Sequence, residues 1–463
     1  MSKAGKSGSA GKQESTRRPG AEWRAAAWAV RHPGNLAVPG AFGVGCAELG
    51  AQTMGVGTGA AAVVLAAWYR GHPDTFDRWV TPRVRSWRRR WGTYVGRRWR
   101  KAMEDCELFT THRKSGADQF PRVLKVRAHS PTVDTVWVHL ARGQSMRSFT
   151  DRLEELCAAL NVERVGVEKV KPRVIGLIVQ HREPFTAVID APEMPSDVDA
   201  VDLASVYLGD DEFGGQWRES LTGNHWFVAG ATGAGKNSIG WSLLRTLAPL
   251  LRDGLVRLWV CDPKQMEFAK LASVAHRYAA TDEDCADLIS DYVEDLKTAQ
   301  HGLGDKGKRT LTMSAQTPIN LLIVDELGAL LAYGDYAREN RRNLALVGSQ
   351  GRSSGHHMVG FVQEPTKDTV PVRDLFTVRV CLRLTASGQV DGVLGEDARL
   401  RGALADEIPN IPETAGIGYV IRPRSRTPMR VRAAYVDDRE IDQLVNVVRN
   451  GRSSGRTNLE VVA

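Results

Sequence analysis

The chain has 463 residues, a formal net charge of +8 and a sequence pI near 9.2. A chain of this length is expected to form about two or three domains. The basic charge suits a polyanion or an anionic membrane surface as a partner. The six cysteines are scattered without a C-x-x-C pair, which argues against a disulfide framework or a structural zinc site and fits a reducing cytosol.

The N-terminal part has two regions of different character. Residues 1–32 form a basic, polar tail that we expect to be disordered, and it shows no evident cleavable signal peptide. Residues 33–70 contain two apolar halves, 36–46 and 56–69, and Glu48 is the only charged side chain from the start of the first half to the end of the second.

Each half is shorter than the roughly 17–25 residues of a membrane-spanning helix. Even so, the region is rich in Gly and Ala, as closely packed membrane helices are, and basic residues flank it on both sides. We therefore predict a membrane hairpin with both ends on the cytoplasmic side. A helical hairpin buried in a soluble protein is the alternative.

Residues 71–118 are a basic juxtamembrane segment in which tryptophans alternate with arginines. Its position beside the apolar region makes anionic lipid the first choice of partner, with DNA phosphates as the alternative. Residues 119–195 are predicted to form a small α/β subdomain. Its expected elements are a helix at 149–160 and strands at 133–140, 165–167 and 174–179.

A glycine-rich turn lies between a predicted strand, 226–229, and a helix that includes 239–244. The turn follows the pattern G-x-x-x-x-G-K, whose backbone N–H groups cradle phosphates while Lys236 reaches the β- and γ-phosphates. The predicted nucleotide-binding residues are Gly230, Ala231, Thr232, Gly233, Ala234, Gly235, Lys236, Asn237 and Ser238. The position after the lysine is normally Ser or Thr, which ligates Mg²⁺, and here it is Asn237.

The other half of an ATPase site follows downstream. Residues 320–324 read as a buried strand that delivers Asp325 beside the Mg²⁺ shell, so Asn237 and Asp325 are the predicted metal ligands. Glu326 is predicted to polarise the attacking water, and Gln363, at the end of another strand, to contact the γ-phosphate and that water. The predicted catalytic set is Lys236, Asp325, Glu326 and Gln363, with ATP and Mg²⁺ as cofactors. Considered singly, the acids and the glutamine could also be surface groups at strand ends.

Further sequence motifs accompany the glycine-rich loop and the strand that ends at Asp325 and Glu326. They are D-P-K-x-x-E at 262–267, R-x-x-G-x-H at 352–357, Gln-x-Pro at 363–365 and a basic strand at 377–384. In their order and spacing, over about residues 200–425, they resemble the FtsK/SpoIIIE family of double-stranded DNA translocases. The resemblance implies a RecA-like P-loop NTPase motor, placed at 196–437, that works as a homo-oligomer, with a hexamer expected.

Three arginines are candidates for a charge that acts in trans on the neighbouring subunit's γ-phosphate, as in ring ATPases. They are Arg352, Arg379 and Arg383, and for each one a solvated or DNA-facing arginine is the alternative. The small α/β subdomain resembles the accessory subdomain that precedes the P-loop in this family. Residues 438–463 are expected to be a short helix and a polar tail, without the winged-helix reader of the chromosomal members.

This layout resembles the transfer proteins of actinobacterial conjugative plasmids and integrative elements. We therefore expect a translocase at the cytoplasmic face of the cell membrane that moves double-stranded DNA between cells, with plasmid-encoded accessory proteins as further partners. Within the motors, the alternatives are a chromosome-partitioning pump and a secretion ATPase of related fold. Because of Asn237, a membrane-tethered DNA-binding or assembly protein that binds nucleotide without turnover is a further alternative.

Overall fold

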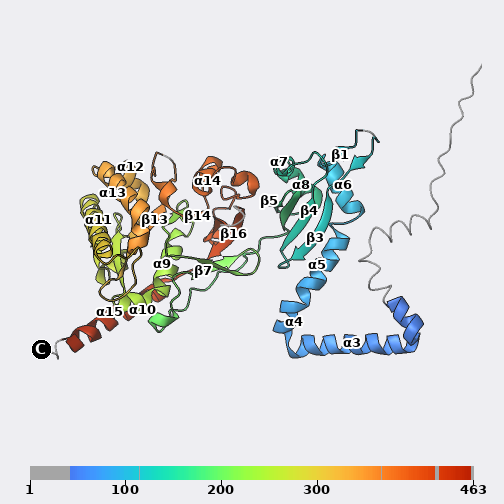
Figure 1. The fold of residues 1–463 in the computed structure, drawn as a ribbon, viewed down its shortest axis with the longest axis horizontal. Helices are drawn as coiled ribbons and strands as arrows, with labels where there is room; N and C mark the ends of the chain where they lie inside the picture. The colour runs from blue at the N-terminus through green and yellow to red at the C-terminus, as the bar shows by residue number, and fades with distance from the viewer. Residues whose placement is uncertain (1–41, 114, 367, 423–426, 460–463) are drawn as a thin grey trace, which may run out of the picture. The chain divides into compact units, whose positions relative to one another are not determined.

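The computed structural model describes residues 42–113, 115–366, 368–422 and 427–459. By its internal contacts the chain divides into two units, Met1–Thr81 and Pro82–Ala463. Figure 1 shows the elements of both units. The predicted tail, 1–32, and the beginning of the predicted hairpin lie outside the described residues.

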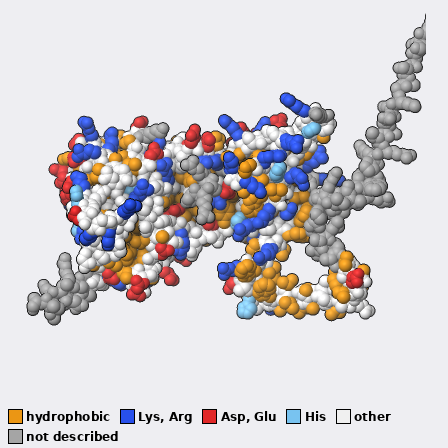
Figure 2. Space-filling view, in the orientation of Figure 1, with side chains coloured by type: hydrophobic (Ala, Val, Ile, Leu, Met, Phe, Trp, Pro, Cys, Tyr) orange, Lys and Arg blue, Asp and Glu red, His pale blue; other side chains and the backbone are white. Residues whose placement is uncertain are grey.

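The described part of the first unit is helical. Residues 42–49 form a helix, Gly50 has a φ of 83°, and two further helices follow, α3 (Ala51–Gly71) and α4 (Pro73–Trp79). No side chain of α3 is buried, and Figure 2 shows apolar side chains along it. With 21 residues and a mean hydropathy of 1.2, α3 is long and apolar enough to cross a membrane, judged by length and composition alone.

The second apolar half is therefore longer than the sequence indicated. Its helix begins at Ala51 instead of Val56, because the residues between these positions, with the single glycine Gly55 among them, are helical along with the apolar residues that follow. The break comes at Gly50, whose left-handed φ suits glycine and ends the preceding helix. The second limb thus reaches the length that a membrane-spanning helix needs.

The second unit begins with a four-stranded antiparallel sheet of order β3-β4-β6-β5 and the helices that pack on it. Its elements are α5 (Thr81–Gly92), α6 (Arg97–Asp105), β1 (Thr110–Thr111), β2 (Asp118–Gln119), β3 (Arg122–Ala128), β4 (Val133–His139), α7 (Met146–Thr150), α8 (Leu153–Leu160), β5 (Arg164–Lys171) and β6 (Val174–Gln180). The three predicted strands are confirmed, the predicted helix at 149–160 is divided into α7 and α8, and β3 was missed.

The basic segment before this sheet belongs to the same core. Tyr94, Trp99 and Met103 are buried in one cluster with the sheet, and the Trp99 indole donates to Pro121 O at 2.9 Å. Arg89 of α5 pairs with the buried Asp134. The accessory domain therefore starts near α5 and not at residue 119, because these aromatic side chains pack inward while their basic neighbours stay at the surface.

The remainder is a ten-stranded sheet of order β11-β10-β12-β13-β9-β14-β15-β16-β7-β8. Its strands are β7 (Val206–Asp211), β8 (Gln216–Glu219), β9 (Trp226–Ala229), β10 (Val256–Cys261), β11 (Arg277–Ala279), β12 (Ile319–Val324), β13 (His356–Val362), β14 (Val378–Leu382), β15 (Ile417–Ile421) and β16 (Pro428–Ala433). The strands from β11 to β14 are mutually parallel, and the others pair antiparallel.

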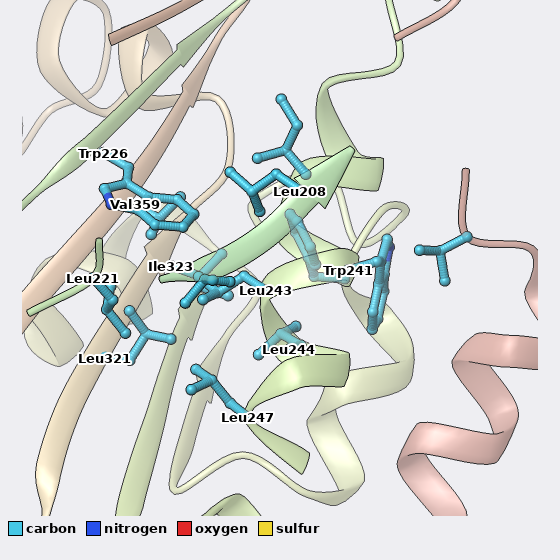
Figure 3. Packing of buried hydrophobic residues seen from close by; sticks show 14 of the residues in the cluster. Leu208, Leu221, Trp226, Trp241, Leu243, Leu244, Leu247, Leu321, Ile323 and Val359 are labelled. Carbon is cyan, nitrogen blue, oxygen red and sulfur yellow. The ribbon is translucent and has the colours of Figure 1, made fainter. Parts of the chain in front are cut away.

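Helices cover both faces of the parallel strands. They are α9 (Lys236–Thr246), α10 (Ala248–Arg252), α11 (Asp282–Asp305), α12 (Leu327–Ala332), α13 (Ala337–Gln350), α14 (Ser387–Leu394) and α15 (Asp438–Leu459). Within β12, Leu321 and Ile323 join the cluster shown in Figure 3, whereas Leu322 and Val324 join the cluster on the other face. Burial on both faces explains why these strands read as continuous apolar runs.

Two features of this architecture bear on the predictions. An α/β P-loop architecture with a smaller α/β domain before it is what the sequence predicted. The last helix differs, because α15 spans 22 residues instead of the short helix expected near 441–448. Its side chains Ile441, Leu444 and Val448 are buried in the same cluster as α9 and α10.

Candidate nucleotide-binding site

The candidate site lies at the edge of the sheet where the parallel strands end. Strand β9 runs between β13 and β14, so the loop that follows it is flanked by the ends of both neighbours. Gly230 N donates to Val362 O at 3.0 Å on one side, and Ala231 N donates to Arg383 O at 2.8 Å on the other. Ligands of open α/β sheets bind in the crevice at this edge.

The glycine-rich loop leads directly into α9. Gly235 has a φ of 86°, and a Cβ there would lie 2.7 Å from Gly416 N, so a side chain would collide with backbone. Gly416 N in turn donates to Ala234 O at 2.9 Å. The loop is therefore held against β15, with the free N–H groups of the α9 N-terminus at its end, as a phosphate site requires.

Lys236 is the cation of this loop and is only 8% exposed. Its side chain folds back over the loop, so that Nζ lies 3.4 Å from Ala231 O. Burial lowers the pKa of Lys236, while Glu326, Asp325 and Glu267 act in the opposite direction. The ammonium group lies beside the loop whose N–H groups would bind a phosphate, and the carboxylates near it would suit a divalent cation that accompanies the phosphate.

Glu326 has an unusual backbone conformation. Its φ is 47°, in the left-handed region, where it is the N-cap of α12. There the carboxylate accepts a hydrogen bond from Gln363 Nε2 and pairs with Lys264 Nζ at 2.8 Å. Strained backbone of this kind persists where surrounding contacts fix it and is frequent at functional sites.

Gln363 connects the phosphate loop to this glutamate. Its Oε1 accepts a hydrogen bond of 3.0 Å from Thr232 Oγ1, and its Nε2 donates to Glu326. The sequence predicted that Lys236, Glu326 and Gln363 share one site, and the structure brings them to one edge of the sheet. Their roles in catalysis stay predictions.

Asp325 and Asn237 are the predicted Mg²⁺ ligands, and this role stays a prediction. Asp325 is 2% exposed, and burial, followed by the charge of Glu326, raises its pKa to about 7. Asn237 Oδ1 is buried and has no hydrogen-bond partner among the described residues. A carboxylate among other acids and an unsatisfied carboxamide oxygen are hard oxygen donors of the kind Mg²⁺ binds.

The three candidate arginines lie in different places. Arg383 donates to Thr232 O and is 8% exposed, so it supports the phosphate loop of its own chain. Arg379 donates to Phe376 O at 3.1 Å and Val393 O at 3.4 Å, away from the loop. Arg352 is exposed in the turn before β13, at the opposite end of that strand from Gln363. The structure thus favours a role in cis for Arg383, and action in trans by the other two stays a prediction.

Sequence reasoning did not assign a role to two residues of the D-P-K-x-x-E segment. Lys264 pairs with Glu326, and Asp262 is fully buried, with one carboxylate oxygen accepting from Phe268 N and Tyr278. The sequence could have indicated their place in the site, because the strand before this segment, β10, is the neighbour of β12 in the sheet. Parallel strands that are adjacent bring the groups after their ends together.

The region that carries this candidate site is similar in sequence to known proteins. The sequence model of the FtsK/SpoIIIE family matches residues 188–416. A DNA translocase FtsK of Tropheryma whipplei (strain TW08/27) is 24% identical over 345 residues, or 70% of this chain and 45% of that protein. A DNA translocase SftA of Bacillus subtilis (strain 168) is 23% identical over 347 residues, or 69% of this chain and 34% of that protein. This chain thus spans less than half the length of these relatives.

Two solved structures show partial likeness. The pCW3 conjugation coupling protein TcpA, in a monomer form with ATPgS, has a TM-score of 0.48 at 18% identity and covers 76% of this chain and 98% of its own. EssC (ATPases 2 and 3) of Geobacillus thermodenitrificans has a TM-score of 0.46 at 12% identity and covers 60% of this chain and 53% of its own. On the match of the family's sequence model, residues 188–416 form a domain of the FtsK/SpoIIIE family.

Proposed function

We propose that this chain is an ATPase that translocates double-stranded DNA at a membrane. The observation that carries the proposal is the chain of hydrogen bonds from Thr232 through Gln363 to Glu326. It joins the loop that would hold the phosphates to the acid that would polarise water. Such a link lets the presence of a γ-phosphate change the position of the catalytic acid and of β13.

In the proposed reaction, Lys236 and the loop N–H groups hold the β- and γ-phosphates of ATP. Asn237 and Asp325 would hold Mg²⁺, which supplies charge neutralisation to the phosphates when bound. Glu326 accepts the proton of the attacking water. In the structure Lys264 and Gln363 both contact Glu326 Oε1, so Glu326 Oε2 is the oxygen that would face the water.

DNA as the substrate is supported by the family domain, by the relatives named as DNA translocases and by the net charge of +8. Basic groups bind a DNA backbone largely without regard to sequence, because the contacts are made to phosphates. Action as a homo-oligomeric ring, with a hexamer as the expected form, belongs to the same proposal.

Membrane attachment and conjugative transfer are the finer parts of the proposal. Attachment is supported by α3, none of whose side chains is buried, and by the basic residues that follow it. Transfer between cells rests on the layout of an apolar segment, an accessory domain and one motor. Chromosome partitioning and secretion are the alternatives. A mating assay with a strain that lacks this protein would distinguish them, because only the transfer role predicts a loss of DNA transfer between cells.

The test of the ATPase is hydrolysis by the full chain with and without double-stranded DNA. We expect DNA to stimulate hydrolysis, Lys236→Ala to abolish it, and Glu326→Gln to keep nucleotide binding while slowing turnover by about 10²–10⁴-fold, the usual contribution of a general base. Glu339→Gln, an exposed acid of α13, is the control and should hydrolyse ATP like the parent.

Two results would contradict the proposed ATPase activity. Turnover by Glu326→Gln at the parental rate would contradict the role of this residue. If the parent binds nucleotide but hydrolyses no ATP with DNA at any Mg²⁺ concentration, the motor proposal fails. The alternative then holds, in which the chain is a membrane-tethered DNA-binding or assembly protein without turnover.

A further inference from the structure

A pocket of about 370 Å³ extends from the phosphate loop to the segment between β16 and α15. It is lined by Lys236, Asn237 and Ser238 at the start of α9, and by Tyr435 and Val436 of the segment between β16 and α15. Trp241 and Met266 lie along its wall. The pocket therefore extends beyond the phosphate loop and includes large apolar side chains among its lining residues.

Tyr435 and Met266 are large apolar side chains that remain at the surface of this pocket. Tyr435 is 57% exposed and Met266 is 76% exposed. Among the described residues, Tyr435 has no ring contact and no hydrogen bond from its side chain. Trp241 differs, because it is 4% exposed and its ring already packs 5.3 Å from Phe268. Tyr435 thus offers an aromatic face to whatever fills the pocket.

The position of Tyr435 relative to the phosphate loop is fixed by backbone hydrogen bonds. Ala234 O accepts from Gly416 N at 2.9 Å, and Gly416 O accepts from Ala433 N at 2.8 Å. Two residues further on, Tyr435 N donates to Ile189 O at 2.8 Å. The backbone at Tyr435 is thereby held in place beside the loop before any ligand binds, so only the side-chain torsions of Tyr435 remain to be ordered on binding.

We infer that Tyr435 stacks on the base of the bound nucleotide and that Met266 packs beside it. This inference rests on the proposed ATP site and extends it from the phosphates to the base. A planar base fits an exposed aromatic ring, and base–aromatic stacking is tolerant of base identity because every base has a π-face. A thioether next to such a ring adds a further favourable contact.

The same arrangement makes the start of α15 part of the nucleotide site. Asp438 and Ile441, in its first turns, also line the pocket. Lys270, another lining residue, pairs with Asp438 at 3.2 Å and with Asp442 at 2.9 Å. A base stacked on Tyr435 would therefore lie against the segment that leads into the last helix.

The experiment compares two ligands on the full chain by titration calorimetry. One is a non-hydrolysable ATP analogue, and the other is inorganic triphosphate, which has no base. We expect Tyr435→Ala to weaken the ATP analogue by about tenfold, equivalent to ~1.4 kcal/mol, and to leave inorganic triphosphate unchanged. Tyr435→Phe should bind both ligands like the parent. Tyr333→Ala, at an exposed tyrosine outside this pocket, is the matched control and should change neither affinity.

The results that would overturn the inference differ from those that would overturn the proposed function. If the parent binds the ATP analogue and Tyr435→Ala binds it equally well, Tyr435 does not stack on the base. If Tyr435→Ala weakens both ligands equally, the residue acts on the fold of the loop and the inference also fails. If the parent binds neither ligand, the nucleotide site itself is refuted.

Discussion

Asn237 is the residue at which the phosphate loop departs from its usual pattern. A Ser or Thr hydroxyl at this position ligates Mg²⁺ directly, whereas the carboxamide oxygen of Asn is carried on a longer side chain. Ser238 cannot replace it, because one step along a helix rotates the side chain by about 100°. The structure adds that Asn237 Oδ1 is buried without a partner among the described residues. The oxygen is thus available, at a geometry shifted from the usual one.

We predict that Asn237→Ser keeps ATP hydrolysis and lowers the Mg²⁺ concentration for half-maximal activity, because Mg²⁺ demands near-ideal octahedral geometry. Asn237→Ala should raise that concentration. It should also stabilise the Mg²⁺-free protein by about 1 kcal/mol, since it removes an unsatisfied buried oxygen. A Mg²⁺ titration of activity and thermal unfolding without metal provide the two measurements. Identical Mg²⁺ curves for parent and both variants would exclude Asn237 as a ligand.

The predicted site residues came from motifs whose chemistry is local. Lys236, Asp325 and Glu326 follow strands whose apolar runs are visible in the sequence, so their position at a strand end could be predicted. Two properties of the site could not be predicted from the sequence. The left-handed φ of Glu326 and its pairing with Lys264 depend on how two neighbouring strand ends meet in space. Tyr435 lies almost 200 residues after the loop, and it reaches the pocket through the pairing of β15 with β16 and the contact of Gly416 with the loop.

At the scale of elements, β5 of the accessory sheet is joined to the motor by a buried arginine. Arg164 pairs with Glu212, and their side chains are 4% and 0% exposed. Arg164 also donates to Gly402 O and to Gln180, each at 3.0 Å. Glu212 further accepts from Arg430 N at 2.9 Å. Because every charged group in this network is satisfied, removal of one partner leaves the other buried and uncompensated.

We predict that Arg164→Ala destabilises the second unit by about 3–5 kcal/mol, as for other broken buried ion pairs. Arg422→Ala removes a neighbouring pair, with Glu168 at 2.9 Å, whose side chains are 30% and 18% exposed, and should cost about 1 kcal/mol or less. Calorimetric unfolding of both variants tests the contrast. The double variant Arg164→Ala with Glu212→Gln should lose less than the sum of the single losses. Equal effects of Arg164→Ala and Arg422→Ala would show that the buried network does not couple the two domains.

The elements themselves were predicted with uneven success, for physical reasons. Strands such as β12 and β6 are buried on both faces and read as unbroken apolar runs. Strand β3 was missed because most of its side chains are exposed or half-buried. In α6, Trp99 and Met103 face the core, but the surrounding arginines and lysine made the segment read as a basic surface. Its packing partner, the β3–β4 sheet, follows later in the chain and gives no local signal.

For the whole molecule, the division at Thr81 separates an exposed apolar helix from a unit with its own cores. The basic segment, 71–118, was predicted to be a juxtamembrane segment that contacts anionic lipid or, as the alternative, DNA phosphates, yet Tyr94 and Trp99 are 1% and 5% exposed within the second unit. Arg89 of the same segment donates to Asp134 and to Pro131 O. Only part of this segment is therefore free to contact lipid headgroups.

This division predicts different outcomes for two truncations. Removal of Met1–Thr81 should move the protein from the membrane to the soluble fraction and leave its ATPase activity intact, because the second unit keeps its core and begins at Pro82, a residue that suits the first turn of α5. Removal of Met1–Lys101 should instead give an unstable protein, since it takes Tyr94 and Trp99 out of the accessory core. Membrane recovery after centrifugation, ATPase activity and thermal unfolding distinguish the two.

A single substitution tests the same anchor in the full chain. Ala61 lies at the middle of α3, where an arginine would cost about 2.5–3.5 kcal/mol if the helix spans a bilayer. We expect Ala61→Arg to lower recovery in the membrane fraction and Ala61→Leu to leave it unchanged, with ATPase activity equal in both. If Ala61→Arg and the protein without Met1–Thr81 both remain in the membrane fraction, α3 is not the anchor, and the exposed basic residues of α5 become the first candidates for membrane contact.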